Sequence, residues 1–224
     1  MIFFESNFRK IFYYIFLTIN FIISPILFYK LLLIPKNEFG LFQSGIVNLV
    51  TNYSLLLSFI CLGIIFSQIY KTKIYILLLV FLFSFVTTLL FFDAILEVVF
   101  ILNLDAVFGF DKFSLIITYF LSIILGIFIW LNPVRHLYLC FILVLLFSFI
   151  FALNVGLKDI EVFGFKSFVN FPGGNIFMVY WILTSVSCIL RILKIKNVTV
   201  FLKIFSSWLV AIGCLSIFFS IFVY

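Results

Sequence analysis

The sequence predicts an all-α, polytopic integral membrane protein, a single bundle of about seven transmembrane helices. Of its 224 residues, 67% are hydrophobic and 10% are charged, whereas a soluble domain has about 45–50% apolar and about a quarter charged residues. The apolar residues also gather in runs near the ~20 residues that a helix needs to cross a hydrocarbon core of ~30 Å. Strands of a membrane barrel would instead alternate in polarity over shorter segments.

Seven apolar runs form the predicted spans of one transmembrane domain. They cover 11–29, 45–69, 74–92, 113–131, 137–155, 176–193 and 204–224. The first run follows the basic pair Arg9 and Lys10, as in a signal sequence, but no small-residue cleavage site comes after it. We therefore expect it to remain as an uncleaved first span.

Charge alternates between the segments that join these spans. One set carries nine basic residues and one acid, Glu5, for a net charge of +8; the other set carries five basic and seven acidic residues, for a net charge of −2. The basic residues of the first set are Arg9, Lys10, Lys71, Lys73, Arg135, Arg191, Lys194, Lys196 and Lys203. By the positive-inside rule this set faces inward, which predicts an inner N-terminus and an outer C-terminus. The expected location is a bacterial plasma membrane or an organelle inner membrane, and the basic charge requires no nucleic-acid partner.

Asp93 and Glu97 stand four residues apart after the third span. The run 74–92 holds 19 uncharged residues, about 28 Å of helix, which already fills the hydrocarbon core. We therefore expect 93–110 to be an interfacial segment at the outer boundary. Either it is a solvated helix end, or it belongs to an acidic vestibule that concentrates cations or protons. The candidate vestibule residues are Asp93, Glu97, Asp105, Asp111, Asp159 and Glu161.

Two further polar features fall in or near the spans. The segment 156–175 is predicted to be an outer loop that rests on lipid or re-enters the membrane, and it contains Pro172. Asn48 and Asn52, at positions i and i+4 of the second span, would share one helix face. That pair can contact a ligand, or it can form hydrogen bonds between helices.

The sequence shows no recognised catalytic or metal-binding motif. Its four cysteines lie within apolar runs and form no CxxC motif, and His136 is the only histidine, which excludes a bis-histidine haem and disfavours a zinc site. There is no glycine-rich phosphate loop and no HExxH motif. We therefore predict no catalytic residue, metal or cofactor.

These observations favour a non-catalytic membrane subunit of a larger complex, energy-transducing complexes included. Its partners would be the lipid bilayer and other membrane protein subunits. A small secondary transporter, or an ion- or proton-conducting protein that uses Asp93 and Glu97, is the first alternative. A membrane enzyme acting on lipid-linked substrates through its outer loops is the second, although the sequence offers it no recognisable nucleophile.

Overall fold

The computed structural model describes residues 40–69, 71–101, 110–131, 136–158, 165–193 and 198–222, together with Ile15. Within these residues there are eight α-helices and no strand, which confirms the predicted all-α class. The predicted first span, 11–29, lies outside the described residues except for Ile15.

The helices follow the apolar runs of the sequence. They are α2 (Leu41–Thr51), α3 (Tyr53–Gln68), α4 (Lys71–Leu90), α5 (Phe92–Ile101), α7 (Phe110–Trp130), α8 (Leu137–Lys158), α9 (Phe165–Leu193) and α10 (Val198–Phe222). An isolated helix of this kind gains little from intrinsic propensity alone. In lipid no water can satisfy exposed backbone groups, so a helix is favoured because it pairs these groups within its own segment.

Four helices are long and apolar enough to cross a membrane. The qualifying stretches are Lys73–Leu90, Leu137–Gly156, Asn170–Arg191 and Val200–Phe219. The pair α2 and α3 also qualifies when taken together, but it is bent by 81°. Helix α7 contributes the shorter apolar stretch Ile116–Trp130.

Two predicted segments differ from the structure. The run 45–69 is not one straight helix, because Asn52 interrupts it with an extended backbone (φ −90°, ψ 91°). The segment 156–175 is not a loop throughout: α8 continues to Lys158, and α9 begins at Phe165 with Pro172 inside it. Packing of α9 against α2 supports a helix there and overrides the local preference of proline and glycine for turns.

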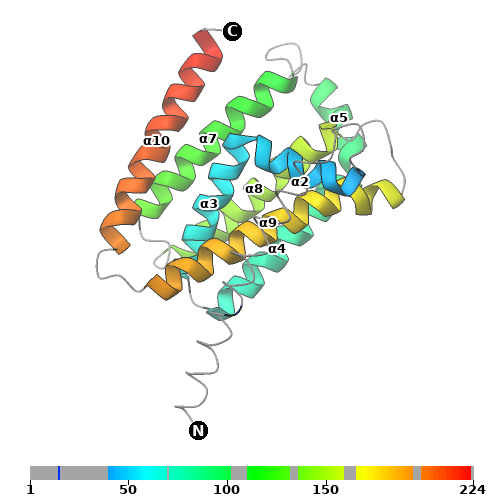
Figure 1. Cartoon of the computed structure of the whole chain (residues 1–224). Coiled ribbons are helices and arrows are strands. Elements are labelled where there is room, and N and C mark those ends of the chain that lie inside the picture. Colours follow the sequence, from blue (N-terminus) through cyan, green and yellow to red (C-terminus); the bar gives the residue numbers. More distant parts are fainter. Residues whose placement is uncertain are drawn as a thin grey trace.

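Helix α3 occupies the centre of the arrangement. It packs against α9 on one side and against α7 on another, while α10 packs on α7, α4 on α8 and α2 on α9. Figure 1 shows the axes of α3, α7 and α10 inclined in a similar way, with α10 running opposite to α3 and α7 and with α9 crossing them obliquely. Ten of the sixteen residues of α3 are buried. This helix therefore connects the α2–α9 pair with the α7–α10 pair.

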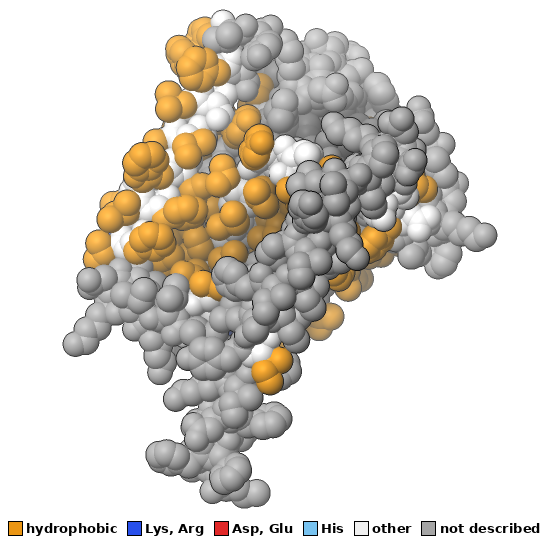
Figure 2. Space-filling model, in the orientation of Figure 1, with side chains coloured by type: hydrophobic (Ala, Val, Ile, Leu, Met, Phe, Trp, Pro, Cys, Tyr) orange, Lys and Arg blue, Asp and Glu red, His pale blue; other side chains and the backbone are white. Residues whose placement is uncertain are grey.

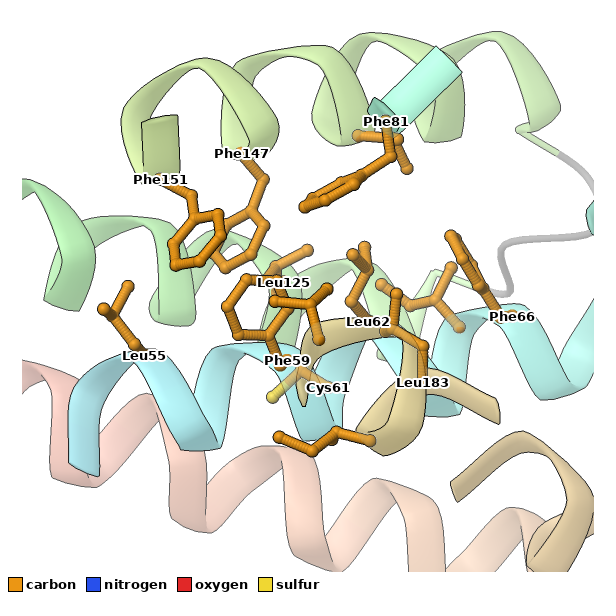
Figure 3. Close-up of a cluster of buried hydrophobic side chains, with 14 of the residues drawn as sticks. Leu55, Phe59, Cys61, Leu62, Phe66, Phe81, Leu125, Phe147, Phe151 and Leu183 are labelled. Carbon is orange, nitrogen blue, oxygen red and sulfur yellow. The ribbon is translucent and has the colours of Figure 1, made fainter. Parts of the chain in front are cut away.

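Phenylalanine side chains fill the core between α3, α4 and α8 (Figure 3). The ring of Phe59 meets Phe147 and Phe151 edge to face, with centroids 4.8 and 4.9 Å apart. Phe81 approaches the same ring at 6.1 Å. Edge-to-face pairs are the favoured geometry for aromatic quadrupoles and add about 0.5–1.5 kcal/mol beyond area burial. The phenylalanine-rich composition thus serves core packing here.

The described surface is also apolar. On α10, Phe201, Trp208 and Phe222 are 60%, 67% and 71% exposed, and Figure 2 shows hydrophobic side chains spread over this flank of the molecule. Monomeric soluble proteins rarely expose contiguous apolar patches larger than a few hundred Å². This surface fits a hydrocarbon environment.

Candidate polar site at the break between α2 and α3

Asn52 closes one helix and opens the next. Its backbone N–H donates to the carbonyl of Asn48 at 3.2 Å, which ends α2. Its side-chain oxygen accepts from the N–H of Leu55 at 3.4 Å and from the hydroxyl of Ser54 at 2.7 Å, which caps α3. Asparagine is among the best N-cap residues because its short side chain satisfies an orphan N–H. The break therefore has a local cause in the sequence.

Helix α2 crosses α9 with two glycines at the contact. A β-carbon at Gly45 would meet the carbonyl oxygen of Phe171, and one at Gly174 would meet the carbonyl oxygen of Phe42, both well inside van der Waals contact. Small residues allow such close backbone approach between membrane helices. The position of α2 is consequently set by α9 as well as by the break at Asn52.

A pair of side-chain amides, one half-buried and one buried, lies beside this crossing. Nδ2 of Asn48 donates to Oδ1 of Asn175 at 3.1 Å, and Nδ2 of Asn175 donates to the carbonyl of Phe171 at 3.0 Å. Asn175 has no solvent exposure. Asn48 and Asn52 thus have separate side-chain partners. Asn48 makes an interhelical bond, whereas the side chain of Asn52 bonds to the start of α3.

The groups at the break are neutral amides, hydroxyls and backbone carbonyls. They can donate and accept hydrogen bonds, but they offer no nucleophile with an adjacent base and no carboxylate for acid–base chemistry. Among the described side chains, no group of three or more His, Cys, Asp or Glu residues could hold a metal ion. The arrangement can join helices or hold a small polar solute.

Of the six acidic residues predicted to form a vestibule, the structure describes the side chains of two. Asp93 and Glu97 lie on α5, and both side chains are exposed. Asp111 lies in the first turn of α7, but its side chain is outside the described set, as are Asp105, Asp159 and Glu161 altogether. Within the described residues, the structure therefore brings only Asp93 and Glu97 together, on a single helix.

Sequence reasoning missed two sets of interactions: those of Asn175 in this region, and those of Arg191 at the other end of α3. Asn175 was placed in a loop; the small residues Gly173 and Gly174 just before it are the signal of a close helix crossing. Arg191 donates from Nη2 to the carbonyls of Phe66 and Ile69, at 3.1 and 2.7 Å. It thereby satisfies the end of α3, as cations near helix C-termini do.

Comparison with protein families, with curated proteins and with solved structures finds no match for this chain.

Proposed function

We propose that this chain is a non-catalytic integral membrane subunit of a larger membrane protein complex. The observation that supports it is how buried and half-buried polar side chains are used. Ser148 donates to the carbonyl of Phe81 at 2.6 Å, Tyr180 to that of Leu78 at 2.8 Å and Ser187 to that of Gly63 at 3.0 Å. Each joins two helices. These three hydroxyls therefore contribute to assembly of the bundle, as expected of a chain that packs into a larger helical complex.

The proposed topology has seven spans, with the N-terminus inside and the C-terminus outside, in a bacterial plasma membrane or an organelle inner membrane. It counts α2 and α3 as one bent span and includes 11–29. The alternating charge of the joining segments supports it. A reporter fused after Tyr224 should be active in the outer compartment, and one fused after Lys73 in the inner compartment. An inner C-terminus would contradict the seven-span count.

Purification from the native membrane tests membership of a complex. In mild detergent, we expect a particle well above the 26.1 kDa of this chain, containing other proteins in fixed ratio. Cross-linking before solubilisation should give the same partners, which controls for association in detergent. A homogeneous particle of this chain alone that carries out transport would overturn the proposal in favour of a carrier.

A small carrier or ion-conducting protein is the second candidate, and the break at Asn52 favours it. Many transporters bind solutes where membrane helices are discontinuous, since unwound backbone there offers free polar groups. The 81° bend between α2 and α3 is such a discontinuity, and the buried Asn175 bonds to Asn48 on its α2 side. Flux into vesicles that contain the purified chain tests this function. A flux that survives Asn48→Ala and Asn175→Ala together would exclude the break as its route.

A further inference from the structure

The described charged side chains separate to opposite ends of the bundle. Lys73 lies in the first turn of α4, and Arg191 lies in the last turn of α9. Lys203 lies near the start of α10. Asp93 and Glu97 lie on α5, beyond the other end of α4. Figure 1 shows the start of α4, the end of α9 and the start of α10 along the lower side of the molecule, with α5 at the upper right. One end of the bundle is therefore cationic.

Hydrogen bonds join the helix ends at this cationic end. Arg191 bonds to the last carbonyls of α3, as described above, and Nε1 of Trp130 donates to the carbonyl of Lys203 at 3.2 Å. The ammonium of Lys203 lies over the Trp130 ring, 5.7 Å from its centroid. This cation–π contact holds the charge close to α7. The ammonium can still donate to an anion because the ring engages only one side of it.

Exposed aromatic side chains surround the same end. Tyr75, Trp130, Tyr138 and Phe201 are 71%, 53%, 86% and 60% exposed. These residues lie, in the same order, near the start of α4, the end of α7, the start of α8 and the start of α10. Tyrosine and tryptophan side chains concentrate at the level of the lipid headgroups, where the ring contacts acyl chains and the polar atom stays wet.

We infer that this end of the bundle binds the phosphate headgroups of anionic phospholipids through Lys73 and Lys203. The inference rests on the proposed placement of the chain in a membrane. The lysine ammonium groups complement the negative charge of the phosphate, and the surrounding aromatic rings can contact the adjoining acyl chains. A soluble phosphate compound would gain only the first of these contacts, so the surface favours a lipid over free phosphate.

Lipid retention in native mass spectrometry tests the inference. The full chain, or the intact complex if it purifies with partners, is prepared in neutral detergent with phosphatidylglycerol, phosphatidylcholine or soluble glycerol phosphate. The test variant is Lys73→Gln with Lys203→Gln. The matched control is Lys112→Gln with Lys166→Gln, which removes the same charge from the first turns of α7 and α9.

We expect phosphatidylglycerol to be retained in preference to phosphatidylcholine and glycerol phosphate. Each lysine removed from the cationic end should lower that affinity by about fivefold, and added salt should weaken it. The control pair should retain lipid as the unmodified chain does. Equal retention of both lipids, equal binding of glycerol phosphate, or the same loss in the control pair would overturn the inference. Partner proteins are scored separately, so failure here leaves the proposed complex standing.

Discussion

Asn48 and Asn175 are joined by a hydrogen bond of 3.1 Å between Nδ2 of the first and Oδ1 of the second, across 127 positions of sequence. One residue lies on α2 and the other is fully buried on α9. This bond lies next to the Gly45 and Gly174 crossing, so it fixes the register of the two helices. Its net contribution is modest, because the two amides also find partners in the unfolded state within a membrane.

A double-mutant cycle measures this bond. Asn48→Ala, Asn175→Ala and the double variant should give a coupling energy of about 0.6 kcal/mol and at most about 1.7 kcal/mol, the average and the maximum found for hydrogen bonds between membrane helices. The measurement is reversible unfolding in mixed micelles. A second cycle, between Asn48 and the distant Ser148, should give a coupling near zero. Equal couplings in both cycles would show that the pair has no specific bond.

Two neighbouring glycines should respond oppositely to the same substitution. Gly174→Ala places a methyl against the Phe42 carbonyl, and we expect it to destabilise the fold by about 1–3 kcal/mol. At Gly173 the nearest atom to a new β-carbon is Cδ2 of Phe42, at an ordinary 3.8 Å. Gly173→Ala should therefore be neutral or raise stability by about 0.5–1 kcal/mol through helix propensity. Thermal unfolding of both variants in one detergent checks the difference, and matching losses would refute the close crossing.

The sequence predicted the long helices well because their signal is physical and local. The run 137–155 contains no charge, and α8 spans Leu137–Lys158. Asp93 and Glu97 lie past the end of α4, on the separate helix α5, and their place at the membrane boundary stays a prediction. Hydropathy and length carry these features because each is set by the transfer of one segment into lipid.

The break at Asn52 and the start of α9 were not predictable in the same way. An asparagine within an apolar run can be a buried partner or a cap, and periodicity does not separate the two. Pro172, Gly173 and Gly174 indicate a turn by composition, yet their contact with α2 keeps them helical. Such contacts join residues far apart in sequence, so the Asn48–Asn175 pair could not be read from local pattern.

Two serines on facing helices should differ in their contribution to stability. Ser148 of α8 is fully buried and donates to the Phe81 carbonyl of α4 at 2.6 Å, while Ser84 of α4 donates to the Leu145 carbonyl of α8 at 3.3 Å. Shorter, fully desolvated bonds are stronger. We expect Ser148→Ala to lower the free energy of unfolding by about 0.5–1.5 kcal/mol and Ser84→Ala by less. The reverse order in detergent unfolding curves would contradict this geometry.

The exposure of Asp93 and Glu97 predicts the outcome of a labelling and neutralisation experiment. In a variant whose four native cysteines are replaced by alanine, cysteines at 93 and 97 should react with an impermeant thiol reagent added from outside. A cysteine in place of the buried Ser84 should remain unlabelled.

If these acids only solvate the start of α5, Asp93→Asn with Glu97→Gln leaves partner association intact and changes stability by less than about 0.5 kcal/mol. If they attract cations to a conduction path, the same pair of substitutions abolishes flux while assembly survives, and the carrier becomes the favoured function. Unlabelled cysteines at 93 and 97 would instead place α5 within the membrane, where an unpaired acid costs far more than at its edge.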